Sequence, residues 1–318
     1  MAQADVVIVS PALRRENNGN WQTANRWAHY LREDYGVDVM REWEAQGKLP
    51  RLLIALHARR SAASLAAYAA YGGPSALVLT GTDIYRDIAT DTSARRSLEL
   101  ATRLVVLQEA ALNKLPEGLR GKAEVIYQSA PALAPYHPSP ARRHYDVTMV
   151  GHLRPEKDPL TFIAASQLSA QPLARFVHIG GALDPELGAA ATAAASRRYH
   201  WLGSLPHGDV RQRIKRSHVL ALTSRMEGGA NVIIEAVTCG VPVLASDIDG
   251  NRGMLGEQYE GYFPPGDAAA LARLVDRSIA DPAWYAHLKA QCAARAPLFA
   301  PAAERAAVRA LAARLLVR

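Results

Sequence analysis

Residues 218–246 read HVLALTSRMEGGANVIIEAVTCGVPVLAS and give the clearest indication of the fold. A short apolar run ends at Thr223, and a glycine-bearing turn follows it. Apolar residues then recur at helical spacing over 230–239, and a second apolar run covers 241–246. A strand, a helix and a second strand in this order are typical of a βαβ unit with parallel strands. The stretch therefore predicts a parallel sheet covered by helices.

The same alternation runs through the rest of the chain. Short, continuous apolar runs indicate strands buried on both faces, and they lie at 5–10, 37–40, 52–57, 76–80, 103–107 and 123–127, then at 145–151, 174–180, 199–203, 218–223 and 241–246. Helical patterns lie between many of them, at 21–35, 92–101, 157–170, 184–197, 207–216, 230–239 and 266–280. Two such series predict an α/β protein with two Rossmann-like, parallel-sheet domains.

The domain boundary is expected at PALAPYHPSPARRH, residues 131–144, which has four prolines and no periodicity. We expect an N-terminal domain at 1–135, a linker at 136–144 and a C-terminal domain at 145–281. A helical segment at 282–318 follows, and it could pack back on the first domain. Parallel α/β domains bind ligands beyond the carboxyl ends of their strands, so we expect the site in a cleft between the domains.

The composition excludes several classes of protein. The 318 residues include only two cysteines, Cys239 and Cys292, which excludes a disulfide scaffold or a zinc ribbon and fits a reduced, cytoplasmic setting. No run approaches the roughly 18 apolar residues of a membrane span. The N-terminus lacks the charged region of a signal peptide. We therefore expect a globular cytoplasmic protein with no stable membrane association.

The net charge of +7 suits an anionic ligand. The basic residues are 31 arginines and 6 lysines, a ratio that genome composition explains better than function does. Arginine doublets are scattered and lack interleaved aromatic residues, as at Arg59–Arg60, Arg95–Arg96, Arg142–Arg143 and Arg197–Arg198. This pattern argues against nucleic acid as a partner.

The turn before the helix at 230–239 has the residues that would hold an anion and a diol. Gly228 and Gly229 let a ligand approach the backbone, and free N–H groups at a helix start favour an anion. Glu227 precedes this turn. Glu235, two helical turns on, could accept hydrogen bonds from vicinal hydroxyls through its two oxygens. The alternative is an ordinary strand–turn–helix with two exposed glutamates.

This stretch resembles the signature of family 4 of the GT-B glycosyltransferases, E-G-x-G-x-x-x-x-E-A-x-x-x-G-x-P-V. The resemblance implies a GT-B fold, with two Rossmann-like domains facing a central cleft. It implies that Glu235 holds the ribose of a nucleotide and that the donor sugar is contacted by Glu227, Gly228, Gly229, Ala230 and Asn231. Ala230 stands where the family usually has glycine, which reshapes the sugar pocket.

The segment VGHLRPEKDP, residues 150–159, resembles the family's G-R-L-x-x-x-K-G. The resemblance implies that basic residues here neutralise the donor diphosphate as the sugar–nucleotide bond breaks, without a metal or other cofactor. Lys157 stands at the family's lysine, and we expect it to be catalytic together with Arg154 and Glu227. His152 replaces the usual arginine. It either binds the donor or packs at a strand end.

A further segment, YHWLGSLPHGDV at 199–210, resembles the family's F-L-G-x-V region. The resemblance implies that the nucleotide base meets the backbone near Ser204 and Leu205. No cluster with the spacing of metal ligands is present in the sequence.

The loop RRENNGNWQTANRW, residues 14–27, is expected to bind the acceptor. Gly19 matches a glycine turn of the family. Charge and small donors come from the neighbouring residues Arg14, Asn17, Asn18 and Asn20. Together they would form a cradle for a small anion. The alternative is a surface loop rich in turn-forming residues.

The loop LTGTDIYRD, residues 79–87, is the second part of the expected acceptor site. Many family members carry a histidine after this strand, and here Thr82 takes its place. We expect Thr82, Asp83 and Arg86 to contact the acceptor. His57 ends the preceding strand and could face the site or be structural. Whether His57 or His152 takes part in catalysis stays open.

Five motifs together, GNWQTANRW, TGTDIYRDI, VIYQSAP, GHLRPEKDP and EGGANVIIEA, look like those of a narrower group, the selenosugar synthases of selenoneine biosynthesis. The resemblance implies that UDP-glucose or UDP-N-acetylglucosamine reacts with selenophosphate to give a 1-selenosugar and UDP. Selenophosphate is already anionic, so its attack needs no strong general base. The sequence does not decide between retention and inversion at the anomeric carbon.

Two alternatives remain. The first is a family-4 glycosyltransferase acting on a lipid-linked or polysaccharide hydroxyl. The helix at 21–35 argues against a membrane-facing version, because it carries Arg26, Arg32, Glu33 and Asp34, as a solvated face does. The second is a nucleotide-sugar binding protein without catalysis. The joint presence of Lys157, Glu227 and Glu235 favours an enzyme.

Overall fold

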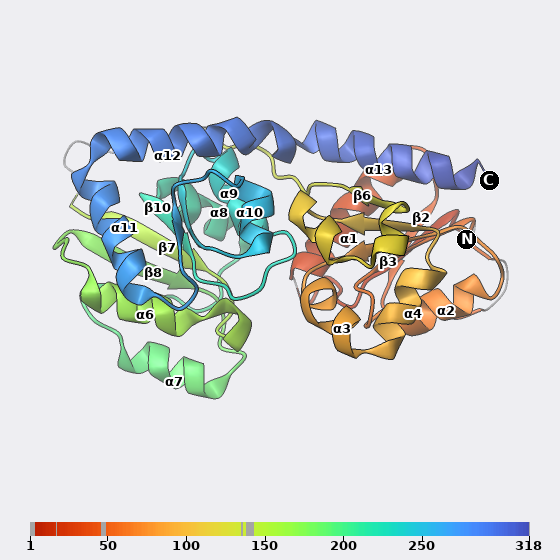
Figure 1. The fold of residues 1–318 in the computed structure, drawn as a ribbon, viewed down its shortest axis with the longest axis horizontal. Coiled ribbons are helices and arrows are strands. Elements are labelled where there is room, and N and C mark those ends of the chain that lie inside the picture. Colours follow the sequence, from red (N-terminus) through yellow and green to blue (C-terminus); the bar gives the residue numbers. More distant parts are fainter. Residues whose placement is uncertain (1–3, 17, 46–48, 135, 138–142, 318) are drawn as a thin grey trace. The chain divides into compact units, whose positions relative to one another are not determined.

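The computed structural model describes residues 4–16, 18–45, 49–134, 136–137 and 143–317. Asn17 of the expected acceptor loop and residues 138–142 of the expected linker lie outside this part of the chain. The chain divides into two compact units, drawn in Figure 1. Unit 1 comprises residues 1–129 and 301–318, and unit 2 comprises residues 130–300.

The described residues of unit 1 form a parallel six-stranded sheet in the order β2-β1-β3-β4-β5-β6. The strands are β1 (Val6–Val9), β2 (Val37–Met40), β3 (Leu52–Leu56), β4 (Ser75–Leu79), β5 (Arg103–Val106) and β6 (Ala123–Val125). Every residue of β1, β3 and β4 is buried, as their continuous apolar sequences predict.

Helices cover this sheet (Figure 1). They are α1 (Gly19–Leu31), α2 (Ala62–Ala69), α3 (Ile88–Thr90), α4 (Thr92–Leu100), α5 (Glu117–Arg120) and α13 (Pro301–Leu316), with a π-helical turn η1 (Asp83–Asp87) and a 3-10 turn η2 (Glu109–Lys114). Trp27 of α1 and Leu311 of α13 are buried in one hydrophobic core. The end of the chain thus completes the core of the first unit.

A buried glutamate fastens α13 to α1. Glu304 of α13 accepts hydrogen bonds from Arg26 Nε at 2.6 Å and from the indole N–H of Trp27 at 2.9 Å. The hydroxyl of Ser129 donates a further bond at 2.6 Å. Glu304 is 1% exposed, so these donors compensate for the lost hydration of its charge.

The described residues of unit 2 form a second parallel sheet in the order β12-β11-β10-β7-β8-β9. The strands are β7 (Tyr145–Val150), β8 (Ala174–Ile179), β9 (Tyr199–Trp201), β10 (Val219–Leu222), β11 (Val243–Ser246) and β12 (Tyr262–Phe263). The helices are α6 (Pro159–Leu168), α7 (Pro185–Ala193), α8 (His207–Arg216), α9 (Asn231–Thr238), α10 (Asp249–Leu255), α11 (Ala268–Ala280) and α12 (Pro282–Arg295), with 3-10 turns η3 (Pro155–Lys157) and η4 (Ala296–Phe299).

The C-terminal segment 282–318, which we expected to be helical and able to pack back on the first domain, is divided between the two units. Helix α12 belongs to unit 2 and α13 belongs to unit 1. The turn η4 separates the two helices, and Pro301 begins α13, a position that proline favours because its missing N–H is not needed there. The alanine-rich composition on both sides gave no sign of this division.

Candidate active site

An ion pair between Lys157 and Glu227 lies at the centre of the candidate site in unit 2. Lys157 Nζ is 2.5 Å from Glu227 Oε1, and the two side chains are only 14% and 10% exposed. Lys157 ends the turn η3 after β7, and Glu227 lies in the loop after β10. These strands are neighbours in the sheet, so the loops that follow them meet. The structure thus brings together two residues that the sequence assigned to the donor site.

Hydrogen bonds and an ion pair connect the loop after β7 to the loop after β10. The Thr223 hydroxyl donates to the carbonyl of Lys157 at 2.8 Å, and the Arg225 N–H donates to the carbonyl of Glu156 at 2.9 Å. The Arg225 guanidinium also lies 2.9 Å from a carboxylate oxygen of Asp158. Arg225 and Asp158 lie within the quoted segments 218–246 and 150–159, but neither was assigned a role from the sequence.

Gly250 supports the Glu227 loop by close approach. A Cβ atom at this position would lie 2.0 Å from the carbonyl oxygen of Glu227. Next to it, Asn251 is buried and donates to the carbonyl of Ser246 at 2.8 Å, while Ser246 Oγ donates to the carbonyl of Ser224 at 2.5 Å. The start of α10 therefore presses directly on the loop that carries Glu227.

His152 occupies a junction of three loops, which follow β7, β8 and β9. Its Nδ1 accepts the Gly181 N–H at 3.0 Å. A Cβ on Gly181 would lie 2.6 Å from Ser204 Oγ, so all three residues are close. Burial and then the charge of Arg154 lower the pKa of His152. The ring is thus neutral at pH 7 and carries its proton on Nε2, a hydrogen-bond donor.

Arg154 has an unsatisfied donor. Its Nε is buried and has no hydrogen-bond partner among the residues that the structure describes. Buried guanidinium N–H groups are normally hydrogen-bonded, because an unpaired one loses its hydrogen bonds to water and gains none in the protein. Ligand oxygens such as those of a diphosphate would supply the missing acceptor.

Glu235 and His207 form a second polar pair. Glu235 lies on α9 and is buried, and its Oε1 is 2.6 Å from Nε2 of His207, the first residue of α8. The sequence assigned Glu235 to the ribose but did not single out His207. The one sequence signal for His207 was its position in the segment 199–210, which was expected to meet the nucleotide base. In the same segment, Ser204 is exposed and Leu205 is half-buried.

The start of α9 is open. Ala230 is the N-cap residue, and its methyl group makes no side-chain cap bond to the first turn. The helix begins at Asn231, directly after Gly228 and Gly229, as the sequence predicts. Uncapped N–H groups at a helix start attract an anion.

In unit 1, the expected acceptor loop forms the start of α1. Asn18 is its N-cap, and its side-chain oxygen accepts the N–H groups of Asn20 and Trp21 at 3.0 and 3.3 Å. Gly19 and Asn20 are the first two residues of the helix. Arg14 lies in the preceding turn with its side chain exposed. Part of the Asn18 amide is therefore used in capping.

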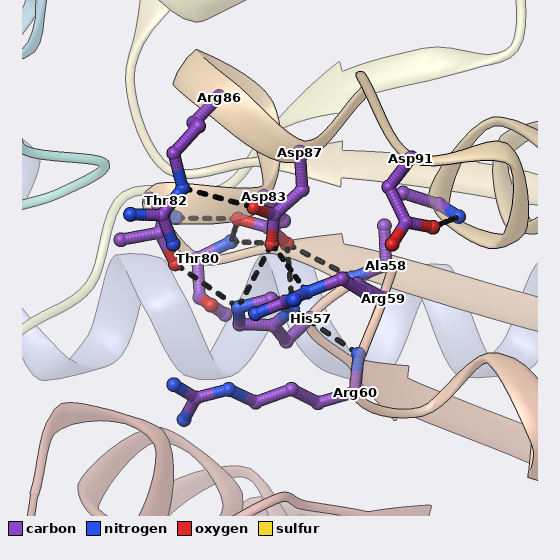
Figure 2. Close-up of polar contacts among 12 residues, drawn as sticks. His57, Ala58, Arg59, Arg60, Thr80, Thr82, Asp83, Arg86, Asp87 and Asp91 are labelled. Carbon is purple, nitrogen blue, oxygen red and sulfur yellow. Dashed lines mark hydrogen bonds and ion pairs between the residues drawn. The ribbon is translucent and has the colours of Figure 1, made fainter. Parts of the chain in front are cut away.

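The second expected acceptor loop is built around Asp83 (Figure 2). Asp83 is fully buried, and its oxygens accept the N–H groups of Thr80 and Ala58 at 3.0 Å and of Gly81 at 2.7 Å. We expected Asp83 to contact the acceptor, but its carboxylate turns back on the strand ends and shapes the loop instead. Thr82, which is half-buried, keeps a hydroxyl at the loop surface.

Arg86 and a second carboxylate flank this loop. Arg86 is exposed, and its Nε lies 3.1 Å from Oδ1 of the buried Asp87. Arg59 Nε lies 3.0 Å from the other oxygen of Asp87. The sequence did not single out Asp87. Its ion pair with Arg59 joins the loop after β4 to the loop after β3.

Metal-binding clusters and membrane-spanning helices are both absent from the described residues. No three His, Cys, Asp or Glu side chains gather there as a metal site requires. No helix in the same part of the chain has the length and apolar character to cross a membrane.

Comparison with known proteins identifies the family. Residues 139–297, half of the 318-residue chain, match the model of the glycosyl transferases group 1. The chain belongs to this family.

Curated relatives resemble parts of the chain. A 2-deoxystreptamine N-acetyl-D-glucosaminyltransferase of Streptomyces fradiae is 29% identical over 203 residues, covering 62% of this chain and 48% of the relative. An Escherichia coli enzyme, UDP-Gal:alpha-D-GlcNAc-diphosphoundecaprenol alpha-1,3-galactosyltransferase, is 31% identical over 129 residues, or 38% of this chain and 33% of the relative. The chain spans half or less of the length of these relatives.

Solved structures share the fold over nearly the whole chain. HepE of Anabaena, solved with UDP and glucose, has a TM-score of 0.75 at 18% identity and covers 97% of this chain and 99% of its own. Sucrose-phosphate synthase of Thermosynechococcus elongatus has a TM-score of 0.77 at 17% identity, covering 98% and 99%. The expected GT-B fold, with two parallel-sheet α/β domains, is confirmed.

Proposed function

We propose that this protein is a glycosyltransferase that transfers glucose or N-acetylglucosamine from a UDP-sugar to selenophosphate. The selenium atom attacks C1 of the sugar, a C–Se bond forms, and the bond from C1 to the diphosphate oxygen breaks. The electron pair of that bond leaves with UDP. The product of this step is a 1-selenosugar whose selenium still carries the phosphoryl group.

The observation that carries the proposal is the Lys157–Glu227 ion pair beside the open start of α9. A departing diphosphate gains negative charge, and fixed positive groups that already point at it lower the barrier. Lys157 and Arg154 supply cations, and His152 supplies a neutral N–H donor. In this proposal Glu227 orients Lys157 and contacts the donor sugar with residues 228–231.

Glu235 is assigned to the ribose. A buried carboxylate can accept bonds from both hydroxyls of a vicinal diol, and His207 fixes its orientation through the 2.6 Å contact. Similar folds occur in HepE, solved with UDP-glucose, and in the pneumococcal O-GlcNAc transferase GtfA, solved with UDP and GlcNAc. These proteins support UDP as the nucleotide and either sugar as the transferred group.

The acceptor is assigned to unit 1, at the start of α1 and at the loop containing Thr82. Among the described residues, both places offer small polar groups and arginines, and the carboxylates beside Thr82 are engaged by backbone N–H groups (Asp83) or by the ion pairs of Arg59 and Arg86 (Asp87). A selenium nucleophile that is already anionic suits such surroundings, whereas a sugar hydroxyl must lose a proton.

The test is turnover by the full chain. The protein is incubated with UDP-glucose or UDP-N-acetylglucosamine and selenophosphate, while UDP release and a selenium-bearing sugar are followed by mass spectrometry. Inorganic phosphate in place of selenophosphate is the matched control. We expect UDP release to depend on selenophosphate, and NMR of the product gives its anomeric configuration.

The second candidate is transfer to a hydroxyl acceptor. The names of the two curated relatives favour it, since one names 2-deoxystreptamine and the other α-D-GlcNAc-diphosphoundecaprenol as the acceptor. Turnover with such acceptors and none with selenophosphate would overturn the first proposal.

A further inference from the structure

His57 sits at the end of β3 in an unusual backbone conformation. Its φ is +74°, in the left-handed region that few residues other than glycine adopt, histidine, asparagine and aspartate being the more frequent exceptions. The side chain is buried, at 2% exposure. This conformation directs the ring at the neighbouring loop after β4, where Nε2 lies 3.1 Å from the hydroxyl oxygen of Thr82 (Figure 2).

The hydrogen bonds of the ring define its tautomer. The N–H of Arg60 points at Nδ1 at 3.4 Å, so Nδ1 is an acceptor. Burial is the largest influence on the pKa of His57 and lowers it; the charge of Arg60 lowers it further, against the opposing effect of Asp83. The neutral ring therefore carries its proton on Nε2 and donates it to Thr82. The hydroxyl proton of Thr82 must then point away from the histidine.

Two carboxylates and three arginines surround the ring, and among the described residues Asp87 Oδ2 is buried with an ion-pair contact but no hydrogen-bond partner. Both oxygens of Asp83 accept backbone N–H groups, and the oxygens of Asp87 lie 3.0 Å from Arg59 and 3.1 Å from Arg86. Asp87 Oδ2 is 3.9 Å from His57 Nε2, too far to compete with Thr82. Arg60 is exposed, and its guanidinium has no partner within the described ranges. Thr82 and Arg60 both contact the His57 ring, Thr82 through its hydroxyl and Arg60 through its backbone N–H, and a hydroxyl donor and a cation on neighbouring loops suit an oxyanion.

We propose that His57 is a positioning residue that turns the Thr82 hydroxyl proton toward the acceptor, and that Thr82 and Arg60 bind the acceptor's phosphoryl oxygens. The acceptor's identity as selenophosphate rests on the proposed function, whereas the geometry requires only a small oxyanion. Oxygen accepts hydrogen bonds better than selenium does. Binding through oxygen therefore leaves the selenium atom free to attack C1.

The test uses thiophosphate, the sulfur analogue, as a binding probe for the full chain in calorimetry with UDP present. Thr82→Val keeps the shape and removes the hydroxyl, and we expect about tenfold weaker binding, the loss of one charge-assisted bond. His57→Asn tolerates the left-handed backbone and keeps an acceptor for the Arg60 N–H, but it does not reach Thr82. We expect the same tenfold loss.

Matched controls separate positioning from folding. Thr82→Ser keeps the hydroxyl and should bind within about twofold of the wild type, and UDP affinity should be unchanged in every variant. In the double variant, His57→Asn should add no further loss to Thr82→Val, since both remove the same bond. Additive losses, an unaffected His57→Asn, or a wild-type chain that does not bind thiophosphate would each overturn the inference.

The inference and the proposed function fail separately. The expected binding pattern without selenium transfer overturns only the assignment of selenophosphate. Selenium transfer that is indifferent to both Thr82→Val and His57→Asn overturns the roles of Thr82 and His57 and leaves the proposed function standing.

Discussion

Lys157 Nζ and Glu227 Oε1 lie 2.5 Å apart, although their residues are 70 positions apart in the chain. Because both side chains are largely buried, neither charge can rely on water for its stabilisation. The pair also keeps the lysine in one place before a ligand arrives. In the proposed function, a lysine fixed in this way would supply charge to a leaving diphosphate without reorganising during the reaction.

Lys157→Ala should lower kcat by about 100- to 1000-fold, the range for loss of one preorganised charge-stabilising group. It should also lower the melting temperature, because Glu227 is left without its cation. UDP release measures the first effect and calorimetry the second. Lys289→Ala, which removes an exposed lysine of α12, is the control and should change neither. Full activity in Lys157→Ala would falsify the diphosphate assignment.

Glu235→Ala should weaken UDP binding and, more specifically, erase the preference for UDP over 2′-deoxy-UDP. If the carboxylate holds the ribose diol, the wild type loses about tenfold affinity when one hydroxyl is missing. The variant should bind both nucleotides alike. His207→Ala should reduce the preference less, because it orients the carboxylate without replacing it. A variant that keeps the full preference would show that the ribose lies elsewhere.

Gly250→Ala should impair both stability and activity, because its Cβ would lie 2.0 Å from the carbonyl oxygen of Glu227. Overpacking of this kind typically costs about 1–3 kcal/mol. Gly118→Ala in α5 is the matched control, since nothing lies within 4 Å of its Cβ. The control should be neutral or gain about 0.5–1 kcal/mol from better helix propensity. Equal melting temperatures for both variants would contradict the prediction.

Stability should fall as the pH drops from about 6.5 toward 4, in part because of His178. Burial lowers its pKa to about 4, while its ring nitrogens contact the carbonyl of Gly151 and the hydroxyl of Tyr199. Within this window the unfolded chain binds a proton that the folded chain does not, so acid favours unfolding. The contribution at pH 5 is at most about 2 kcal/mol.

A scan of unfolding free energy from pH 7.5 to 5 tests the contribution of His178. His178→Gln cannot take up this proton, so its stability should depend less on pH than that of the wild type. Parallel curves for the two proteins would exclude His178 as a cause.

Glu304→Ala should destabilise unit 1 by about 3–5 kcal/mol, the range for breaking a buried ion pair. The substitution leaves Arg26 and the indole of Trp27 without their shared acceptor. Glu304→Gln should be milder, because its amide oxygen still accepts one of these bonds. Denaturant unfolding measures both, and equal losses for the two variants would contradict the role of the hydrogen bonds.

Much of the fold and part of the site could be predicted from the sequence because they are local. The glycine turn and the helix at Asn231 lie within one short stretch, and the buried strands are continuous apolar runs. The short elements were beyond prediction, since β12 has two residues and the turn at Asp83–Asp87 is π-helical. Neither is long enough to show a hydrophobic period.

From the sequence alone, the continuous apolar runs predicted the α/β class, because strand and helix patterns arise between near neighbours. The resemblance of its motifs indicated the family and assigned expected roles to Lys157, Glu227 and Glu235. Only the tertiary structure decided the partners. It paired Glu235 with His207 and His57 with Thr82, and it buried Asp83 among backbone N–H groups. These contacts arise because parallel strands place their carboxyl ends at one edge of a sheet, so loops distant in the chain meet there. The spacing of residues along the chain does not predict which of these loops will be in contact.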